Sequence, residues 1–300
     1  MGNAETTALG RDLGAYGVWT GVLLSQDAER VALLPGVGRE LEKLGYGTLW
    51  LGGGPGVDRA EPVLAATSRL TVATGILSIW DWEPAEVAGE YHRVQAAHGG
   101  RFVLGLGVSH AALTERYRRP YSAMREFLDG LDAAPQPVPA ERRVLAALGP
   151  RMVELSRDRA GGAHPYLVTV EHTAHTRAAL GPGAVLAPEL KVVLDEDEER
   201  ARATARNYLS FYLALPNYTN NLRRYGFGDE DFADGGSDRL VDAVFALGNA
   251  ASVAGRARAF REAGADHVAF QVVTQEPLRD LPVEAYADLA RALDLTGTGD

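Results

Sequence analysis

The chain has 300 residues, of which 46% are hydrophobic and 23% charged, and it contains no cysteine. The lack of cysteine excludes disulfides, thiolate metal sites, iron–sulfur clusters and a cysteine nucleophile. The net charge of −10 argues against a nucleic-acid or anionic-membrane partner, because both require a basic surface. No apolar run reaches the roughly 20 residues of a membrane span, and no signal peptide is evident, so we expect a cytoplasmic protein.

The first half of the chain predicts four strands, each followed by a helix. The strands are predicted at 15–24, 48–51, 70–79 and 101–108, and the helices at 27–44, 60–67, 84–98 and 111–131. The strands are apolar runs with little alternation, which is typical of parallel strands buried on both faces.

The second half continues this rhythm and then interrupts it. Strands are predicted at 143–148, 165–170, 191–194 and 267–273, and helices at 150–159, 173–180, 196–215, 238–247, 252–263 and 282–293. The Pro-rich stretch 133–139 is interpreted as a surface connection, because a strand-like segment follows it directly. Eight βα units predict one domain, 1–300, folded as a closed (β/α)8 TIM barrel with a helical insertion at about 196–236. An open doubly wound sheet is the alternative.

Tryptophans mark the expected active-site end of this barrel, where the strands have their carboxyl ends. All four tryptophans fall at the ends of the first three strands, and Thr20 follows the first of them. They are Trp19, Trp50, Trp80 and Trp82. This coincidence favours an aromatic substrate pocket that takes a planar ligand, with ordinary packing at the rim as the alternative.

Glycines at the same strand ends would let the backbone approach a ligand closely. They are Gly52 and Gly53 after the second strand, Gly75 in the third and Gly107 in the fourth. A second glycine turn, formed by Gly161, Gly162 and Ala163, offers backbone amides that could cradle a phosphate. A helix C-cap followed by a turn is the alternative interpretation of that segment.

One histidine stands out among the seven in the chain. His110 directly follows the fourth strand, where a general acid–base would reach the pocket. The other histidines form no HExxH motif, and the pair at 172 and 175 lacks an evident third ligand, so no metal site is expected.

Four segments, taken in order, resemble one known family. They are LTVATGILSIW (70–80), GGRFVLGLGVSH (99–110), RAGGAHPYLVTVEHT (159–173) and the stretch from PELKVV to RRYGF (188–227). Together they are similar to the bacterial luciferase-like superfamily and, within it, to the coenzyme F420-dependent oxidoreductases.

The resemblance implies a cofactor and the residues that contact it. It places a non-prolyl cis peptide at Gly75–Ile76 behind the deazaflavin ring, and Val108 and Ser109 along the ring. It places the phosphate at the Gly161–Gly162 turn. F420 carries a hydride, so the implied activity is hydride transfer to or from a small organic substrate. An FMN-dependent monooxygenase and a non-catalytic barrel retained as a binding protein remain alternatives. Many relatives dimerise, so a homodimer is expected.

The chain also departs from one branch of that family. Gly52–Gly53 stands where the sugar-phosphate dehydrogenases have an Asp-His pair, whose histidine is the acid–base. His110 stands at about the position of their glutamate. The sugar-phosphate activity is therefore not expected here, and His110 is the first choice for a proton donor.

Overall fold

The computed structural model describes residues 6–25, 27–276 and 281–295, and its centre is a sheet in which every pairing is parallel. The strands are β1 (Tyr16–Thr20), β2 (Thr48–Leu51), β3 (Thr71–Thr74), β4 (Leu77–Ser78), β5 (Phe102–Gly107), β6 (Arg143–Leu145), β7 (Gly162–Ala163), β8 (Val185–Leu186), β9 (Glu189–Val193), β10 (Phe245–Leu247) and β11 (Val268–Val272). Their order is β10-β9-β11-β1-β2-β3-β5-β6-β7-β8, with β4 beside β5.

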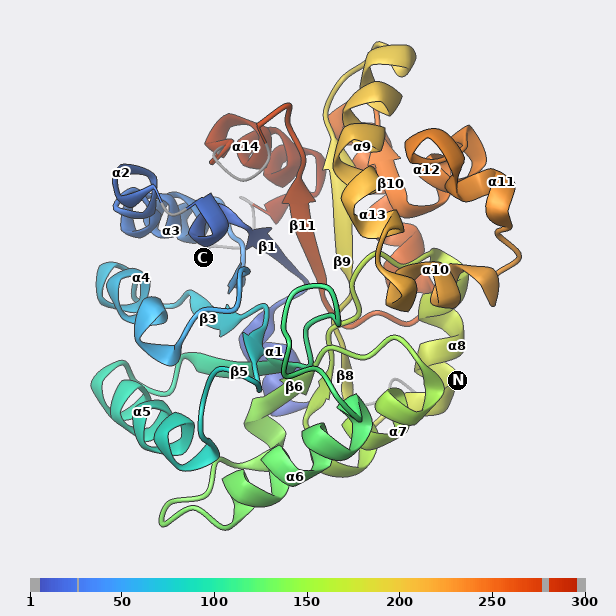
Figure 1. Cartoon of the computed structure of the whole chain (residues 1–300). Helices are drawn as coiled ribbons and strands as arrows, with labels where there is room; N and C mark the ends of the chain where they lie inside the picture. Colours follow the sequence, from blue (N-terminus) through green and yellow to red (C-terminus); the bar gives the residue numbers. More distant parts are fainter. Residues whose placement is uncertain (1–5, 26, 277–280, 296–300) are drawn as a thin grey trace.

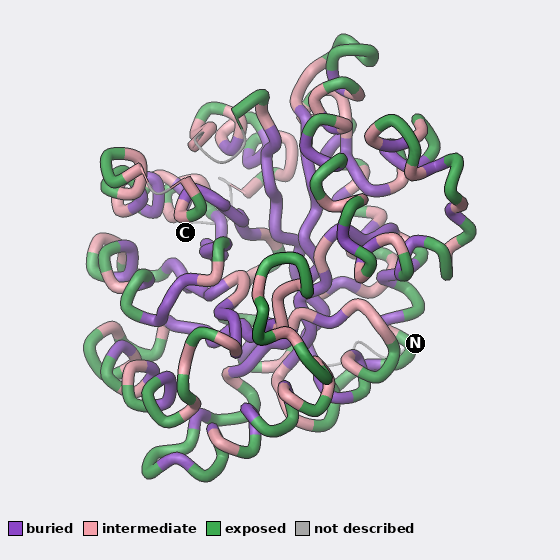
Figure 2. The backbone as a smooth tube through the Cα atoms, in the orientation of Figure 1, coloured by how far each residue is buried: buried purple, intermediate pink, exposed green. Residues whose placement is uncertain are grey.

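Helices cover the outside of this curled sheet (Figure 1). They are α1 (Ala8–Leu13), α2 (Ala28–Val31), α3 (Leu34–Lys43), α4 (Glu61–Ala66), α5 (Pro84–Ala97), α6 (Pro120–Asp132), α7 (Pro150–Arg159), α8 (Val170–Leu180), α9 (Glu198–Leu213), α10 (Pro216–Arg223), α11 (Asp229–Phe232), α12 (Asp238–Val244), α13 (Ala250–Glu262) and α14 (Val283–Ala292). Figure 2 shows that the strands are buried while the helices turn one exposed face to solvent, as expected of amphipathic helices on a parallel sheet.

The α/β architecture and the parallel sheet are confirmed, whereas the closed eight-stranded barrel is not established by the strand pairing. The sheet order ends at β8 on one side and at β10 on the other. Only Ala187 and Pro188 separate β8 from β9 along the chain. We therefore describe the sheet as a curled half-barrel.

Several element boundaries differ from the prediction. The expected strand 165–170 is wrong: β7 ends at Ala163, and Leu167 lies in a loop at φ 55°, fully buried. The apolar pattern there reflects burial of a loop and not strand pairing. The expected helix 111–131 begins only at Pro120, because residues 111–119 form a loop; proline favours the first turn of a helix. The expected helix 238–247 is wrong in its last three residues, because α12 ends at Val244 and Phe245–Leu247 form β10. The two-residue β8 was not predicted, because so short a strand carries almost no pattern.

Other expectations are confirmed. The strand 48–51 and the helix 150–159 have the predicted bounds. The third strand is broken between β3 and β4, and the Gly75–Ile76 peptide bond in the gap is cis.

The ring of Trp50 contacts those of His164 and His267 inside the sheet, and we call these three residues the ring column. The ring of Trp50 is fully buried and stacks on His164 at 4.1 Å between centroids, with an interplanar angle of 5°. Its Nε1 donates to Nε2 of His267 at 3.1 Å, and Nδ1 of His267 donates to the carbonyl oxygen of Gly14 at 2.8 Å. The carbonyl can only accept, so His267 carries its proton on Nδ1. The column therefore joins β2 to the segments that precede β1 and β11.

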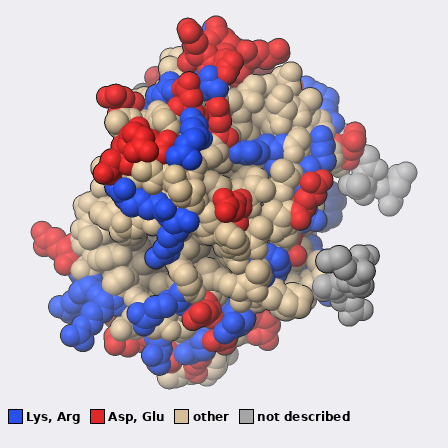
Figure 3. Space-filling view, turned by 90° about the vertical axis from the view of Figure 1, so that its right-hand side faces the viewer, with Lys and Arg blue, Asp and Glu red and all other residues tan. Residues whose placement is uncertain are grey.

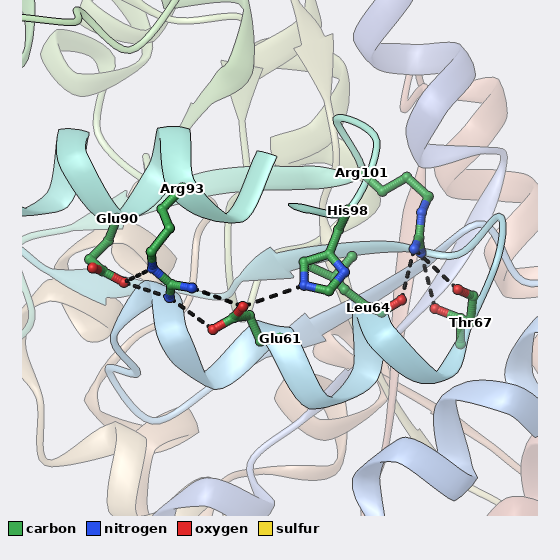
Figure 4. A network of polar contacts seen from close by, with 7 residues as sticks. All are labelled: Glu61, Leu64, Thr67, Glu90, Arg93, His98 and Arg101. Atoms are coloured by element: carbon green, nitrogen blue, oxygen red, sulfur yellow. Dashed lines mark hydrogen bonds and ion pairs between the residues drawn. The ribbon is translucent and has the colours of Figure 1, made fainter. Parts of the chain in front are cut away.

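A polar network joins α4 to α5 on the outer surface (Figure 4). The carboxylate of Glu61 accepts two hydrogen bonds from Arg93, at 2.9 and 2.8 Å, and lies 3.5 Å from Nε2 of His98. Arg101 donates to the carbonyl oxygens of Leu64 and Thr67 at the end of α4. His98 is thus a satisfied structural residue.

Helices α9, α10 and α11 lie within residues 196–236, where the sequence predicts an insertion, and α12 follows them before β10. The side chain of Asp197 caps α9, and Glu198 and Glu199 occupy its first turn, where negative charge suits the helix dipole. Acidic side chains gather at the top of the face shown in Figure 3, the level at which α9 begins in Figure 1. No helix in the described part of the chain combines the length and the apolar character that crossing a membrane requires.

Candidate functional site

Aromatic rings from five segments meet at the carboxyl end of the sheet. Trp19 in β1 contacts Tyr166 at 5.4 Å between ring centroids, and Tyr166 contacts Tyr212 of α9, also at 5.4 Å. Tyr212 contacts Tyr218 of α10 at 5.4 Å, and Tyr218 contacts His110 at 5.1 Å. We call these five residues the aromatic mouth. Trp19 lies next to the carboxyl end of β1, and Tyr166 and His110 lie in the loops that follow β7 and β5, so the chain of contacts lies where a parallel α/β sheet places its ligands.

Trp19 occupies the space that two of the predicted cofactor glycines leave open. It is 5% exposed, and its Nε1 donates to the carbonyl oxygen of Gly75 at 2.8 Å. A Cβ atom at Gly52 would lie 2.1 Å from Cζ2 of Trp19, and one at Gly75 would lie 2.8 Å from its Nε1. The small size of Gly52 and Gly75 therefore makes room for this indole, and a contact of either glycine with a ligand stays a prediction.

The other glycines at this end also have partners within the chain. A Cβ at Gly107 would lie 2.5 Å from Cγ1 of Ile76, so Gly107 accommodates the Ile76 side chain. Gly53 has φ +95° and follows β2 in a turn beside Leu24, where the left-handed backbone itself favours glycine. Thr20 is buried, and its hydroxyl accepts from the backbone N–H of Val22 in the next turn, so it does not line a pocket.

The predicted phosphate turn lies at the opposite end of the sheet. Gly161 and Gly162 stand at the start of β7, where Cβ atoms would meet the carbonyl oxygens of Glu141 at 2.4 Å and Val185 at 2.3 Å. Ala163 is fully buried. These glycines permit close approach of neighbouring strands, so the assignment of this turn to cofactor phosphate is wrong.

The four tryptophans do not share one rim. Trp50 lies in the ring column inside the sheet and is 0% exposed, so it offers no ligand surface. Trp80 is half-buried at the mouth's edge, where its Nε1 donates to the carbonyl oxygen of Val108 and its ring contacts Tyr117 at 6.0 Å. Trp82 packs on the loop after β2, since a Cβ at Gly56 would meet its ring at 2.7 Å.

A half-buried surface remains beside the aromatic mouth. It consists of Gly75 and Ile76 on one side and Val108, Ser109 and His110 on the other. The Nδ1 atom of His110 is buried and has no hydrogen-bond partner among the described residues. Burial lowers the pKa of His110, so the imidazole is neutral near pH 7. This surface therefore combines apolar side chains with a buried ring nitrogen that has no hydrogen-bond partner among the described residues.

A buried ion pair that was not predicted from the sequence lies beneath the aromatic mouth. Lys191 and Glu189, both in β9, are fully buried, and Nζ of Lys191 lies 2.7 Å from Oε2 of Glu189. Nζ also lies 3.4 Å above the centre of the Tyr166 ring, within range of a cation–π contact. Burial lowers the pKa of Lys191 to about 8 despite the attraction of Glu189, and burial raises the pKa of Glu189. Oε1 of Glu189 has no partner among the described residues.

Three tyrosine hydroxyls and one amide form a hydrogen-bonded cluster above this pair. The hydroxyl of Tyr166 lies 2.7 Å from that of Tyr208 and 3.0 Å from that of Tyr212, which are 2.9 Å apart. Tyr166 donates to Oε1 of Gln271 at 2.8 Å, and Nε2 of Gln271 donates to Tyr208 at 2.6 Å. Burial raises the pKa of all three tyrosines, so they remain protonated near neutral pH.

The loop 108–119, between β5 and α6, passes over the carboxyl end of the sheet, in the centre of Figure 1. Ser109 and Arg119, near its two ends, have φ of 54° and 46°. Arg116 donates to the carbonyl oxygen of Trp80, whereas Arg118 and Arg119 are exposed and have no carboxylate partner among the described residues. The loop thus carries positive charge in a chain whose net charge is −10.

Two open cavities lie away from the mouth. One of about 370 Å³ lies between α9, β10 and α13, and one of about 520 Å³ lies between α8 and α12; both are bordered by Asp242 and Arg256. Neither is lined by a residue of the aromatic mouth. Within residues 6–25, 27–276 and 281–295, no three His, Cys, Asp or Glu side chains gather in a way that could hold a metal ion.

Comparison with known proteins identifies the family. A family model described as luciferase-like monooxygenase matches residues 18–267. The chain belongs to this family. An uncharacterized protein of Mycobacterium tuberculosis and one of Mycobacterium bovis are each 28% identical to it, over 72% of this chain and 83% of theirs.

Solved structures of low sequence identity share the fold of this luciferase-like protein. An F420-dependent secondary alcohol dehydrogenase in complex with an F420–acetone adduct has a TM-score of 0.68 at 12% identity, covering 94% of this chain and 98% of that one. The coenzyme F420-dependent tetrahydromethanopterin reductase of Methanopyrus kandleri has 0.68 at 17% identity, with coverage of 95% and 97%. The oxygenating constituent of 3,6-diketocamphane monooxygenase from Pseudomonas putida, in complex with FMN, has 0.67 at 13% identity, with coverage of 95% and 97%.

Proposed function

We propose that this luciferase-like protein is an oxidoreductase that binds coenzyme F420 at the aromatic mouth, within a barrel closed between β8 and β9. It transfers a hydride between the deazaflavin and a small organic substrate. The observation that carries the proposal is the half-buried surface at Gly75–Ile76 and Val108–Ser109, next to the unpartnered Nδ1 of His110. The F420-dependent enzymes among the structural neighbours support the choice of cofactor.

Apolar side chains would contact the ring of the cofactor, and guanidinium groups would contact its anionic part. Ile76 and Val108 would contact the faces and edges of a planar ring, with Trp19 fixed beneath Gly75 as part of the floor. The exposed guanidinium groups of Arg118 and Arg119 would attract the anionic part of the cofactor. When bound, F420 supplies the hydride chemistry, and the protein supplies binding, orientation and exclusion of water.

His110 is the proposed proton-exchanging residue. The imidazole is neutral because burial lowers its pKa, so Nδ1 or Nε2 can hold the proton and the other nitrogen can accept. Its ring is held against Tyr218, and Nδ1 has no hydrogen-bond partner among the described residues that would compete for it. This arrangement leaves one nitrogen free for a ligand atom.

Two other functions have specific support. An FMN-dependent monooxygenase is favoured by the structural neighbour that holds FMN. A non-catalytic barrel is favoured by Trp19, whose indole fills the space beside Gly52 and Gly75 that we had expected a cofactor to use.

Titration of the purified protein separates these three functions. F420 and FMN are added in turn while cofactor fluorescence and protein fluorescence are followed. Micromolar binding of F420 supports the proposal, tight binding of FMN without F420 supports the monooxygenase, and binding of neither supports the non-catalytic barrel. The double variant Arg118→Gln/Arg119→Gln should weaken F420 binding about tenfold, a loss typical of a charge-assisted contact. Arg291→Gln, which removes one exposed charge on α14, is the control and should bind as the wild type does.

A further inference from the structure

We propose that Lys191 is a positioning residue of the candidate site: its ammonium group holds the ring of Tyr166, and Tyr166 joins the two sides of the aromatic mouth. The inference deepens the proposed function, on which it rests for its bearing on cofactor binding, because that proposal places the cofactor at the mouth. The observations that carry it are the contacts of the Tyr166 ring and the burial of the cation beside it.

The Tyr166 ring lies where the two sides of the aromatic mouth meet. Its centroid lies 5.4 Å from that of Trp19, and Trp19 is bonded to the carbonyl oxygen of Gly75 on one side of the half-buried surface. The centroid of Tyr166 also lies 6.0 Å from that of Tyr218, whose ring contacts His110 on the other side. A displacement of the Tyr166 ring would therefore reach both sides of this surface.

Side-chain contacts hold Tyr166 in this place. The residue lies in the loop between β7 and α8, outside the strands and helices. Nζ of Lys191 lies 3.4 Å from the centre of its ring. Its hydroxyl is bonded to those of Tyr208 and Tyr212 and to the amide of Gln271. The face of an aromatic ring attracts a cation most strongly where water does not screen the charge, and the Lys191 side chain is 0% exposed.

The chain rarely uses lysine, yet its buried cation beneath the mouth is one. Of 30 basic side chains only Lys43 and Lys191 are lysines, and the others are arginines. Lys43 is exposed on α3, whereas Lys191 is fully buried. An arginine stays charged at every accessible pH, but a buried lysine can lose its proton. The cation beside the Tyr166 ring is therefore one that a rise in pH can neutralise.

The pair formed by Lys191 and Glu189 titrates as one unit beneath the mouth. Burial lowers the pKa of Lys191 to about 8 against the attraction of Glu189, and burial raises the pKa of Glu189. The other ionisable side chains that the described structure places near Nζ stay neutral between pH 7 and 9. Burial lowers the pKa of His164 to about 4, and it raises the pKa of the tyrosines that face Nζ, which are Tyr166, Tyr208 and Tyr212.

The presence of only two lysines makes a direct test possible. Protein without cofactor is labelled with ¹³C at the lysine Cε atoms and with ¹⁵N in the tryptophan indoles, and NMR spectra are recorded from pH 6.5 to 10. The Cε signal of Lys191 reports its own titration, and that of Lys43 is the reference for an exposed lysine. The indole signal of Trp19 reports the Tyr166 ring beside it. Lys43→Gln and Trp19→Phe assign the signals.

The signals of Lys191 and Trp19 should shift together as the pH rises through about 8, because a neutral amine attracts the ring face far less than an ammonium group does. The indole signal of Trp80, whose ring packs on Tyr117, should stay constant and is the matched control. In Tyr166→Leu the Trp19 shift should disappear, whereas a direct effect of the charge on the indole would persist. Tyr166→Phe keeps the ring and should keep the shift.

A second variant tests the role of the cation at constant pH. Lys191→Met/Glu189→Leu removes the cation together with its partner, so that no charge is left buried alone. At pH 7 its Trp19 signal should differ from that of the wild type, and it should not move with pH. From pH 7 to pH 9 the wild-type Kd for F420 should rise about threefold or more relative to that of this variant. The comparison of the two proteins cancels the titration of the cofactor itself.

Three outcomes would overturn the inference. They are a Trp19 signal that stays constant while Lys191 titrates, a Trp19 shift that persists in Tyr166→Leu, and a double variant with the wild-type Trp19 signal at pH 7. If Lys191 keeps its proton up to pH 10, the double variant decides. Circular dichroism and thermal unfolding establish that each variant is folded.

The NMR measurements need no cofactor, so they separate this inference from the proposed function. If F420 does not bind while the Trp19 signal still follows Lys191, the proposed function falls and the positioning of the mouth by Lys191 stands. If F420 binds while the Trp19 signal ignores Lys191, the reverse holds.

Discussion

The indole N–H of Trp19 is bonded to the carbonyl oxygen of Gly75, 56 residues further along the chain, at 2.8 Å. This bond ties β1 to the break between β3 and β4, at the edge of the half-buried surface. A tryptophan that we expected to touch the ligand directly thus holds the backbone on which the ligand would lie.

The packing of Trp19 against Gly52 can be tested by a double-mutant cycle. Gly52→Ala should destabilise the fold by about 1–3 kcal/mol, because a well-packed site does not accept an extra methyl group, and here the Cβ would lie 2.1 Å from the indole. Trp19→Phe removes the hydrogen bond and part of the ring. In the double variant the smaller ring should relieve the clash, so the two losses should not add. Urea unfolding of the four proteins measures this coupling, and additive losses would contradict the close contact.

Removing one partner of the buried pair Lys191–Glu189 should lower the free energy of unfolding more than replacing both partners with apolar residues. Lys191→Met leaves Glu189 buried without a partner, and we expect a loss of about 3–5 kcal/mol. The double variant Lys191→Met/Glu189→Leu should be more stable than either single variant, because it removes both charges from a site that is 0% exposed. Chemical denaturation at pH 7 checks the order, and a double variant less stable than Lys191→Met would refute this explanation.

His110 should matter for turnover and not for the fold. His110→Phe keeps a ring against Tyr218 and removes the unpartnered Nδ1, so thermal stability should be unchanged or slightly higher. With F420 and an accepted substrate, kcat should fall by about 10²-fold or more, the range for loss of a general acid–base. The Kd for F420, measured by fluorescence, should change less than threefold. Kinetics equal to the wild type would remove His110 from the reaction.

Buried histidines should make stability rise with pH between about 4 and 6.5. Burial lowers the pKa of His267 to about 3 and that of His164 to about 4, from an ordinary value of 6.5. In this window the unfolded chain binds protons that the native protein does not, so acid favours unfolding. Each such histidine contributes up to about 1.4 kcal/mol per pH unit.

His267→Gln isolates one of these protons. Its stability should be lower at pH 7, because the bonds to Trp50 and Gly14 are weakened, but it should depend less on pH between 4.5 and 6.5 than that of the wild type. Urea unfolding at several pH values measures both slopes. Parallel slopes would mean that His267 does not titrate as its burial requires.

The edge of the sheet at which the candidate site lies could be predicted from the order of elements, because parallel βα units place their strand ends at one edge. The orientation of individual side chains could not. Trp19 and Trp50 are register partners in β1 and β2, yet Trp19 reaches the mouth and Trp50 stacks on His164 inside the sheet. Their positions in the sequence are equivalent, and only the packing of distant segments separates their roles.

The buried polar cluster was harder still to foresee. Its members come from a loop, β9, α9 and β11, and the hydroxyl of Tyr166 bonds to residues between 42 and 105 positions away. One local signal existed. Glu189 and Lys191 are two residues apart, which places both on one face of a strand, but the predicted strand began at 191 and so hid the pair.

The ring column also determines when the protein can complete its fold. Trp50 and Gly14 form hydrogen bonds with His267, which lies 217 and 253 residues further along the chain. The hydroxyl of Tyr46 donates to the carbonyl oxygen of Tyr286, 240 residues away. During synthesis the first half of the chain therefore emerges while the Trp50 indole still lacks its partner His267. Such non-local contacts slow folding. We therefore expect the core around Trp50 to be buried only after β11 has left the ribosome.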